Sequence, residues 1–158
     1  MENKAKFTVN RDTLEVRMER VFDAPRDLVW RVITNPTLIP QWWGPSQYKT
    51  VVDKFDFKVG GVWRYVHKVN EGEYAFNGVY KEIVPNEKIV DTFEFEPMPG
   101  HILTETMTLT DLPDGKTQFK QVSKYATIED LEGMVASGME SGATETVERL
   151  DKLLKSQK

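Results

Sequence analysis

Two histidines are the side chains in this sequence whose unperturbed pKa lies nearest to neutrality, and each has a functional and a structural interpretation. His67 alternates with Trp63 and Tyr65 on the more apolar face of an expected strand. It could exchange a proton with a bound molecule there, or serve as a buried structural residue. His101 follows a turn at 97–100 and is expected at the surface. Because neither lies in an HxH or HExxH motif, and cysteine is absent, we predict no metal site.

A single carboxylate, Glu105, falls on an apolar strand face. It alternates with Leu103, Met107 and Leu109, on the side that should meet a helix. A carboxylate buried there without a partner would have a raised pKa, which is a common property of functional sites. At an exposed strand end the same residue would face solvent, and both interpretations stay open.

Other polar side chains could orient a ligand. Gln121 and Ser123 share one strand face, and Tyr80 and Glu82 share another, although either face could equally be the solvent side. Ser123 lies in no recognisable nucleophile motif, so no catalytic residue is predicted. The absence of GxGxxG and Walker patterns argues against a nucleotide, and we expect no cofactor.

Tryptophan offers a large rigid apolar surface and methionine an adaptable one, so both could form the walls of a pocket. Packing in the core is the alternative for each. The residues predicted to contact a ligand are Trp43, Trp63, Tyr65, His67, Phe76, Tyr80, Phe93, Glu105, Met107, Gln121, Met134 and Met139.

The elements that must position these residues follow from periodicity. Residues 14–22 alternate as a strand, Pro25 opens a short helix, and Asn35-Pro36 ends it and starts a second one that stops at Pro40. Between residues 48 and 125, six aromatic and β-branched segments are separated by turns, among them Asn70-Glu71-Gly72, which predicts an antiparallel meander.

The C-terminal segment changes to a helical period. Thr127 and Asp130 resemble a capping box, and apolar residues then recur every three or four positions, which predicts one long amphipathic helix over 128–155. Gly138 and Gly142 lie at the edge of its apolar stripe. They either let a strand approach closely or leave space under the helix.

This order of elements predicts an α+β helix-grip fold. An antiparallel sheet must bury one face, and the long C-terminal helix is the element available to cover it. We therefore expect a curved sheet of about seven strands around that helix, with two short helices after the first strand. Apolar cavities can remain where such a sheet wraps a single helix.

Five segments spread over residues 16–154 carry a family resemblance: VFDAPRDLVWRVITNPTLIPQWWGP, FDFKVGGVWRY, GVYKEIVPNEKIV, TMTLTDLPDGKT and GMESGATETVERLDKLL. In this order they resemble the family related to the activator of heat-shock-protein-90 ATPase. That family belongs to the START-like, Bet v 1-like helix-grip superfamily, also called SRPBCC. The resemblance implies a sheet curled around the C-terminal helix and a cavity near the two short helices, but no catalytic residue. The chain is expected to lack the additional N-terminal domain of multidomain eukaryotic members.

Composition limits the partners. The chain has 158 residues with a formal net charge of −4, so we predict one START-like domain over 1–158 and no nucleic-acid partner. It has no apolar run long enough to span a bilayer and no apolar leader, which favours a cytoplasmic protein. A sheet face with Val62, Val66 and Val79 outside could support a homodimer.

The main functional hypothesis is therefore binding of a small hydrophobic molecule, such as a lipid, an aromatic compound or a polyketide-like compound, between sheet and helix. One alternative is a cyclase or dehydratase in which His67 or Glu105 moves a proton. A second alternative, which we favour less, is an interaction with a chaperone ATPase through an outer sheet face or edge.

Overall fold

The computed structural model describes residues 4–70 and 72–157. The remaining positions 1–3, 71 and 158, which belong to the predicted domain and include Glu71 of the predicted 70–72 turn, lie outside the described residues.

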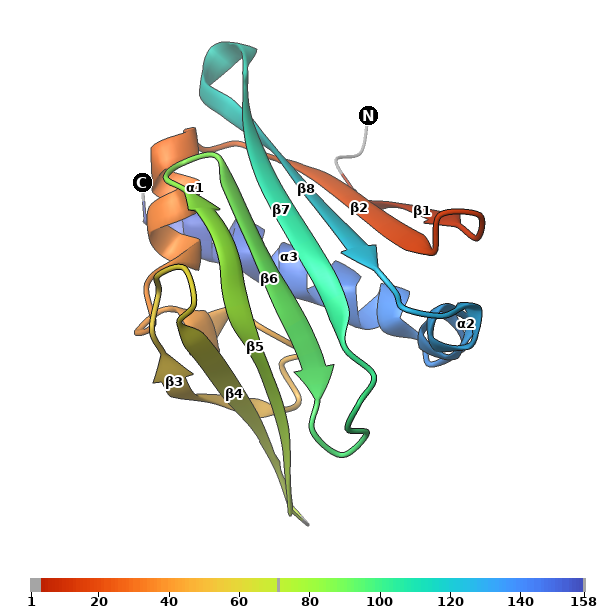
Figure 1. The fold of residues 1–158 in the computed structure, drawn as a ribbon. Coiled ribbons are helices and arrows are strands. Elements are labelled where there is room, and N and C mark those ends of the chain that lie inside the picture. Colours follow the sequence, from red (N-terminus) through yellow and green to blue (C-terminus); the bar gives the residue numbers. More distant parts are fainter. Residues whose placement is uncertain (1–3, 71, 158) are drawn as a thin grey trace.

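An antiparallel sheet of eight strands confirms the predicted α+β helix-grip architecture (Figure 1). The strands lie in the order β1-β2-β8-β7-β6-β5-β4-β3. Their bounds are Lys6–Asn10 for β1, Glu15–Phe22 for β2, Lys49–Phe55 for β3, Val62–Val69 for β4, Gly72–Val84 for β5, Lys88–Phe95 for β6, Leu103–Leu112 for β7 and Lys116–Lys124 for β8. The strand that the sequence did not predict is β1, which pairs with β2 at the edge of the sheet.

A bulge changes which side chains of β5 face inward. The register between β5 and β6 shifts between Tyr80 and Glu82, so Lys81 is an extra residue in its strand. Tyr80 stays buried, whereas Glu82 is exposed and forms an ion pair with Lys88 at 3.3 Å. The prediction that Tyr80 and Glu82 share one strand face is therefore wrong, because one inserted residue reverses the alternation of side chains.

Two short helices follow β2, as predicted. Pro25 is the N-cap of α1, Arg26–Ile33, which buries Leu28, Val29 and Val32. The second is a 3-10 helix, η1, Ile39–Gln41, so it begins later than predicted and contains Pro40, which was expected to end it. A proline is tolerated there because the first turn of a helix does not need its N–H. The end of η1 leads into the loop 42–46, which carries Trp43 and Gly44 towards the concave face of the sheet.

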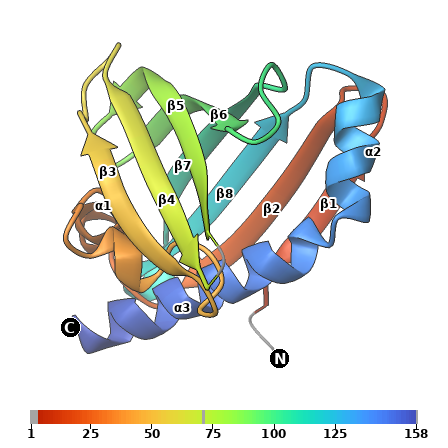
Figure 2. The same ribbon diagram turned by 90° about the horizontal axis from the view of Figure 1, so that it is seen from below.

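The predicted single C-terminal helix is two helices, α2 over Ile128–Ala136 and α3 over Met139–Ser156. The predicted cap is present, since the Asp130 backbone N–H donates to the Thr127 hydroxyl oxygen at 3.1 Å. Gly138 interrupts the helix because its φ of +83° is left-handed, and the apolar period continues through this break. Figure 2 shows α3 running across the open, concave side of the sheet, with α2 at the end where β1 lies.

The core forms between α3 and the inner face of the sheet. Val147, Leu150 and Leu154 of α3 pack in one cluster with Met18 and Phe22 of β2. At the edge of this cluster, Arg20 of β2 has a side chain only 3% exposed and forms ion pairs with Glu148 at 3.1 Å and Asp151 at 3.5 Å. These contacts attach α3 to β2.

The outer face of β4 differs from the surface expected for a dimer. Val62 is exposed and Val79 is half-buried, but Val66 is buried. Homodimer formation stays a prediction.

Candidate functional site

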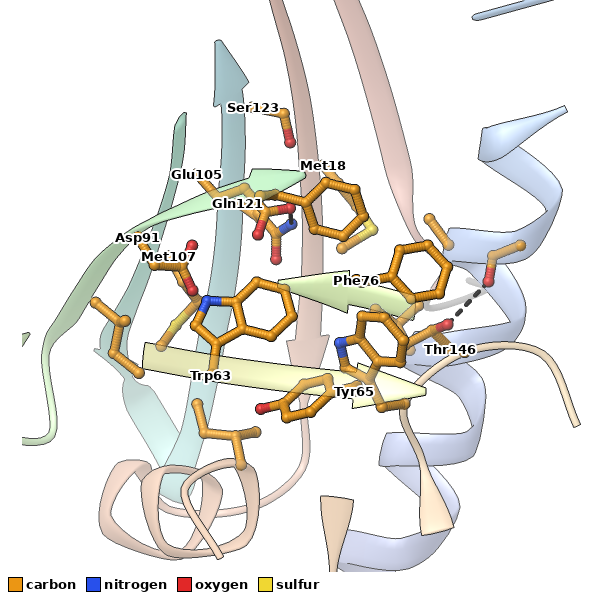
Figure 3. A pocket seen from close by; sticks show the side chains of 18 of the residues that line it. Met18, Trp63, Tyr65, Phe76, Asp91, Glu105, Met107, Gln121, Ser123 and Thr146 are labelled. Carbon is orange, nitrogen blue, oxygen red and sulfur yellow. Dashed lines mark hydrogen bonds between the residues drawn. The ribbon is translucent and has the colours of Figure 1, made fainter. Parts of the chain in front are cut away.

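A cavity of about 370 Å³ lies between the concave sheet, α3 and the loop 42–46 (Figure 3). All twelve residues predicted to contact a ligand line it. They come from the loop after η1 (Trp43), β4 (Trp63, Tyr65, His67), β5 (Phe76, Tyr80), β6 (Phe93), β7 (Glu105, Met107), β8 (Gln121), α2 (Met134) and α3 (Met139). Ligand contact by these residues stays a prediction.

Aromatic rings form much of the wall. Trp43 lies edge-on to Tyr65 and Phe76, with ring centroids 4.9 and 5.2 Å apart. Trp63 lies 4.8 Å from Tyr65 and 6.0 Å from Phe93. Such ring pairs stabilise the fold and leave flat apolar surfaces towards the cavity.

A row of polar side chains crosses this apolar surface. Tyr80 of β5 is opposite Asp91 of β6, Asp91 is opposite Glu105 of β7, and Glu105 is opposite Ser123 of β8. Gln121, a diagonal neighbour, donates from Nε2 to Glu105 Oε2 at 3.0 Å. Figure 3 shows Asp91, Glu105 and Gln121 on the sheet side of the same space that Trp63 and Phe76 border. The cavity therefore has one polar region, built by cross-strand register.

Asp91 was missed by the sequence analysis, although a signal was present. It alternates with Ile89 and Phe93 in β6, the same pattern that singled out Glu105 in β7. All three residues line the cavity together with Glu105. A charged residue on an otherwise apolar strand face therefore marks Asp91 in β6 as it marks Glu105 in β7.

Asp91 and Glu105 are direct cross-strand partners and half-buried, and their carboxyl groups lie within hydrogen-bonding reach of each other. Burial raises the pKa of Asp91 well above its ordinary value, and the neighbouring Glu105 raises it further. Burial likewise raises the pKa of Glu105. Since two ionised carboxylates have no donor between them, a hydrogen bond between these two groups requires a proton, which the raised pKa values favour. The structure thus favours the buried interpretation of Glu105, with part of its surface facing the cavity.

Two tyrosine hydroxyls adjoin the carboxyl pair. Tyr65 and Tyr80 pack in one cluster, and burial raises the pKa of both phenols. They therefore remain neutral hydrogen-bonding groups at physiological pH.

His67 is 5% exposed and lies among Trp43, Tyr48 and Phe76, with ring centroids 5.1, 5.4 and 4.8 Å away. Its Nε2 has no hydrogen-bond partner within the described part of the chain. Burial, and then the positive charge of Arg149, lower the pKa of His67 to about 4. It is a neutral imidazole that lines the cavity, not a hydrogen-bonded structural histidine.

Residues of α3 hold the loop that closes the cavity beside His67. Arg149 donates to the backbone oxygens of Gly44 and Pro40. Glu145 accepts hydrogen bonds from the Ser46 backbone and hydroxyl at 2.9 and 2.7 Å. A Cβ atom on Gly142 would meet, among the described atoms within 4 Å, only Cγ of Pro45 at 3.9 Å. Gly142 is therefore part of the cavity wall and is not a point of close strand packing.

A second cavity of about 440 Å³ adjoins the first between α2 and the segment 95–102. The two share the lining residues Phe76, Phe93, Leu103, Tyr125 and Met134. His101, exposed as expected, forms a hydrogen bond between its Nδ1 and a carboxylate oxygen of Asp130 of α2 at 2.7 Å, and both residues line this second cavity.

Within residues 4–70 and 72–157, no group of three or more histidine, aspartate or glutamate side chains is arranged to hold a metal ion. None of the helices in this part of the chain has the length and hydropathy that a bilayer crossing requires.

A family model described as activator of Hsp90 ATPase homolog 1-like protein matches residues 23–155. The chain belongs to this family. The Hsp90 ATPase activator homolog-like family lies within the SRPBCC superfamily, in agreement with the resemblance seen in the sequence. No curated protein matches the chain.

Solved structures share the fold of this family member over nearly its whole length. A Rhodobacter sphaeroides protein has a TM-score of 0.88 at 22% identity, covering 97% of this chain and 99% of its own. An Arthrobacter aurescens protein has a TM-score of 0.87 at 22% identity, covering 96% and 91%. Protein Ms6760 from Mycobacterium smegmatis has a TM-score of 0.85 at 25% identity, covering 97% and 98%.

Proposed function

We propose that this protein binds a small hydrophobic molecule, with aromatic compounds as the favoured class, in the cavity between the sheet and α3. The observation that carries the proposal is the cavity itself: about 370 Å³ of space bordered by aromatic rings, with few polar groups. Sites of this size and character are typical of small-molecule recognition. Lipids and polyketide-like compounds are the other candidate classes.

The test is to fill the space under α3. In Gly142→Leu the new side chain would extend into the cavity, because little lies within 4 Å of its Cβ position. Ser141→Leu is the matched control, since Ser141 is the exposed neighbour on the same helix. The readout is the fluorescence of prodan, a neutral naphthalene whose emission reports an apolar environment.

We expect prodan to bind the parent protein and Ser141→Leu alike, and Gly142→Leu about tenfold more weakly, a loss of ~1.4 kcal/mol. Native and denaturing mass spectra of the purified protein would show whether it carries a non-covalent adduct. Unchanged prodan binding by a folded Gly142→Leu variant would contradict binding in this cavity.

Proton transfer on a bound substrate is a second candidate, favoured by the proton that Asp91 and Glu105 share at the cavity wall. A suitable probe is 2-indanone, an apolar ketone with acidic C–H bonds. An ionised carboxylate of the pair would remove a proton from carbon, and the carbon would take up a deuteron in D₂O. Exchange at the background rate would contradict this candidate. Interaction with a chaperone ATPase and a cytoplasmic location remain predictions.

A further inference from the structure

The charges around the cavity are unbalanced. Asp91 and Glu105 line it, whereas no lysine or arginine of the described chain does. The part of the wall contributed by α2 and α3 consists of Met134, Met139, Gly142, Ala143, Thr146, Val147 and Leu150, all uncharged. A single shared proton leaves the carboxyl pair with one negative charge, and no side-chain cation of the lining offsets it.

We propose that the cavity selects an apolar molecule carrying a basic amine, and that Asp91 and Glu105 receive its ammonium group. This inference rests on the proposed ligand-binding function and names the ligand class. An ammonium ion would replace the shared proton as the positive charge between two carboxyl groups. It would also donate up to three hydrogen bonds to acceptors that are already in position.

The aromatic wall suits such a head group. Trp63 contacts both Tyr65 and Phe93, and all three line the same cavity as the pair. Ring faces attract cations, and the attraction is stronger in sites that exclude water. An amine attached to an aromatic body would place its rings on this wall and its charge at the polar row.

An independent observation indicates that the polar row is incomplete by itself. Trp63 is 3% exposed, and its Nε1–H has no acceptor within the described residues. In Figure 3 the nitrogen-bearing edge of this indole is turned towards the side where Asp91 lies. A buried donor without an acceptor is costly, so a ligand atom, or Asp91 once it is ionised by an incoming ammonium group, would satisfy it.

The titratable groups that face the pair do not supply the missing cation. They are Tyr65 of β4, Tyr80 of β5 and Tyr125, which directly follows β8, and burial keeps their phenols neutral by raising their pKa. His67 of β4 is neutral above a pKa of about 4. Arg149 of α3 donates to the loop 42–46, at the His67 end of the cavity.

The proton balance gives a signature for this binding mode. At a pH where the pair is protonated and the amine is charged, binding of the ammonium form releases one proton from the pair to solvent, and no covalent bond changes in the ligand. Affinity should then rise with pH by up to about tenfold per unit until the pair is ionised in the free protein.

Three probes share a naphthalene body and differ in the head group, which is an amine, an alcohol or a carboxylate. They are 2-(1-naphthyl)ethylamine, 2-(1-naphthyl)ethanol and 1-naphthaleneacetate. Titration calorimetry at pH 6 and pH 8, in buffers of different ionisation enthalpy, measures affinity and proton release together. We expect the amine to bind at least about tenfold more tightly than the alcohol at pH 8, a difference of ~1.4 kcal/mol. The amine should release a proton at pH 6, and the acetate should bind most weakly.

The double variant Asp91→Asn/Glu105→Gln should lose the preference for the amine and still bind the alcohol. Glu87→Gln is the matched control, because Glu87 is an exposed carboxylate at the turn before β6. If the double variant does not fold, proton release by the parent protein remains a sufficient test.

Equal binding of amine and alcohol without proton release would overturn the amine proposal and leave the proposed function standing. Failure of all three probes to bind would overturn both.

Discussion

The imidazole of His67 lies directly against Gly44: a Cβ atom built on Gly44 would come within 2.5 Å of His67 Nε2. Gly44 also has a left-handed φ of +82°, and its carbonyl oxygen accepts from Arg149 of α3. Three segments distant in sequence, the loop 42–46, β4 and α3, therefore meet at one residue without a side chain. The wall of the cavity beside Trp43 depends on that glycine.

Gly44→Ala should destabilise the protein by about 2 kcal/mol or more, because alanine adds a steric clash to the unfavourable φ. Gly60→Ala is the control, since Gly60 has a similar φ of +85° and nothing within 4 Å of its Cβ position. Urea unfolding should give a loss of about 1 kcal/mol for the control. Equal losses for the two variants would mean that the contact with His67 contributes nothing.

His67 should make the protein less stable in mild acid. Its pKa in the folded state is about 4, below the value of an unfolded histidine, so the unfolded state binds more protons between these two values. Stability should fall by about 1–2 kcal/mol as the pH drops from 6.5 to 4.5. In His67→Leu this part of the pH dependence should disappear. If the parent protein and the variant lose the same free energy of unfolding between pH 6.5 and pH 4.5, the assignment to His67 is contradicted.

Asp91 and Glu105 should make the protein less stable as the pH rises, whereas His67 makes it less stable as the pH falls. Their pKa values are raised in the folded state, so the pair stabilises the fold while protonated, and this contribution is lost as the pH rises through the folded pKa. Asp91→Asn/Glu105→Gln should therefore be more stable than the parent at pH 8, by about 1–3 kcal/mol, and gain less at pH 5. A gain independent of pH would show that the pair is not protonated.

Arg20 should contribute to the attachment of α3. Arg20→Ala removes ion pairs to Glu148 and Asp151 and leaves Asp151, only 14% exposed, without this partner. We expect a loss of about 2–3 kcal/mol in the free energy of unfolding. Arg17→Ala, on the exposed face of the same strand, should cost less than about 0.5 kcal/mol. Comparable losses would contradict a special role for the buried guanidinium.

The sequence by itself determined the order of most elements, with β1 and the helix break at Gly138 as exceptions, and it determined which side chains of a strand share a face. Alternation placed His67 with Trp63 and Glu105 with Met107 on inner faces, and all twelve predicted residues line the cavity. Period alone suffices to show which side chains share a face, because a strand presents successive side chains to opposite sides. For Gln121 and Ser123 it left open which of the two faces is buried.

The tertiary structure decided which inward residues meet. The pairing of Asp91 with Glu105 depends on the register between β6 and β7, and the loss of Glu82 from the inner face depends on one bulge. The meeting of Gly44 with His67 depends on how α3 holds a loop about a hundred residues away in sequence. Periodicity describes each element separately, whereas register, bulges and long-range contacts are set by the packing of the whole chain.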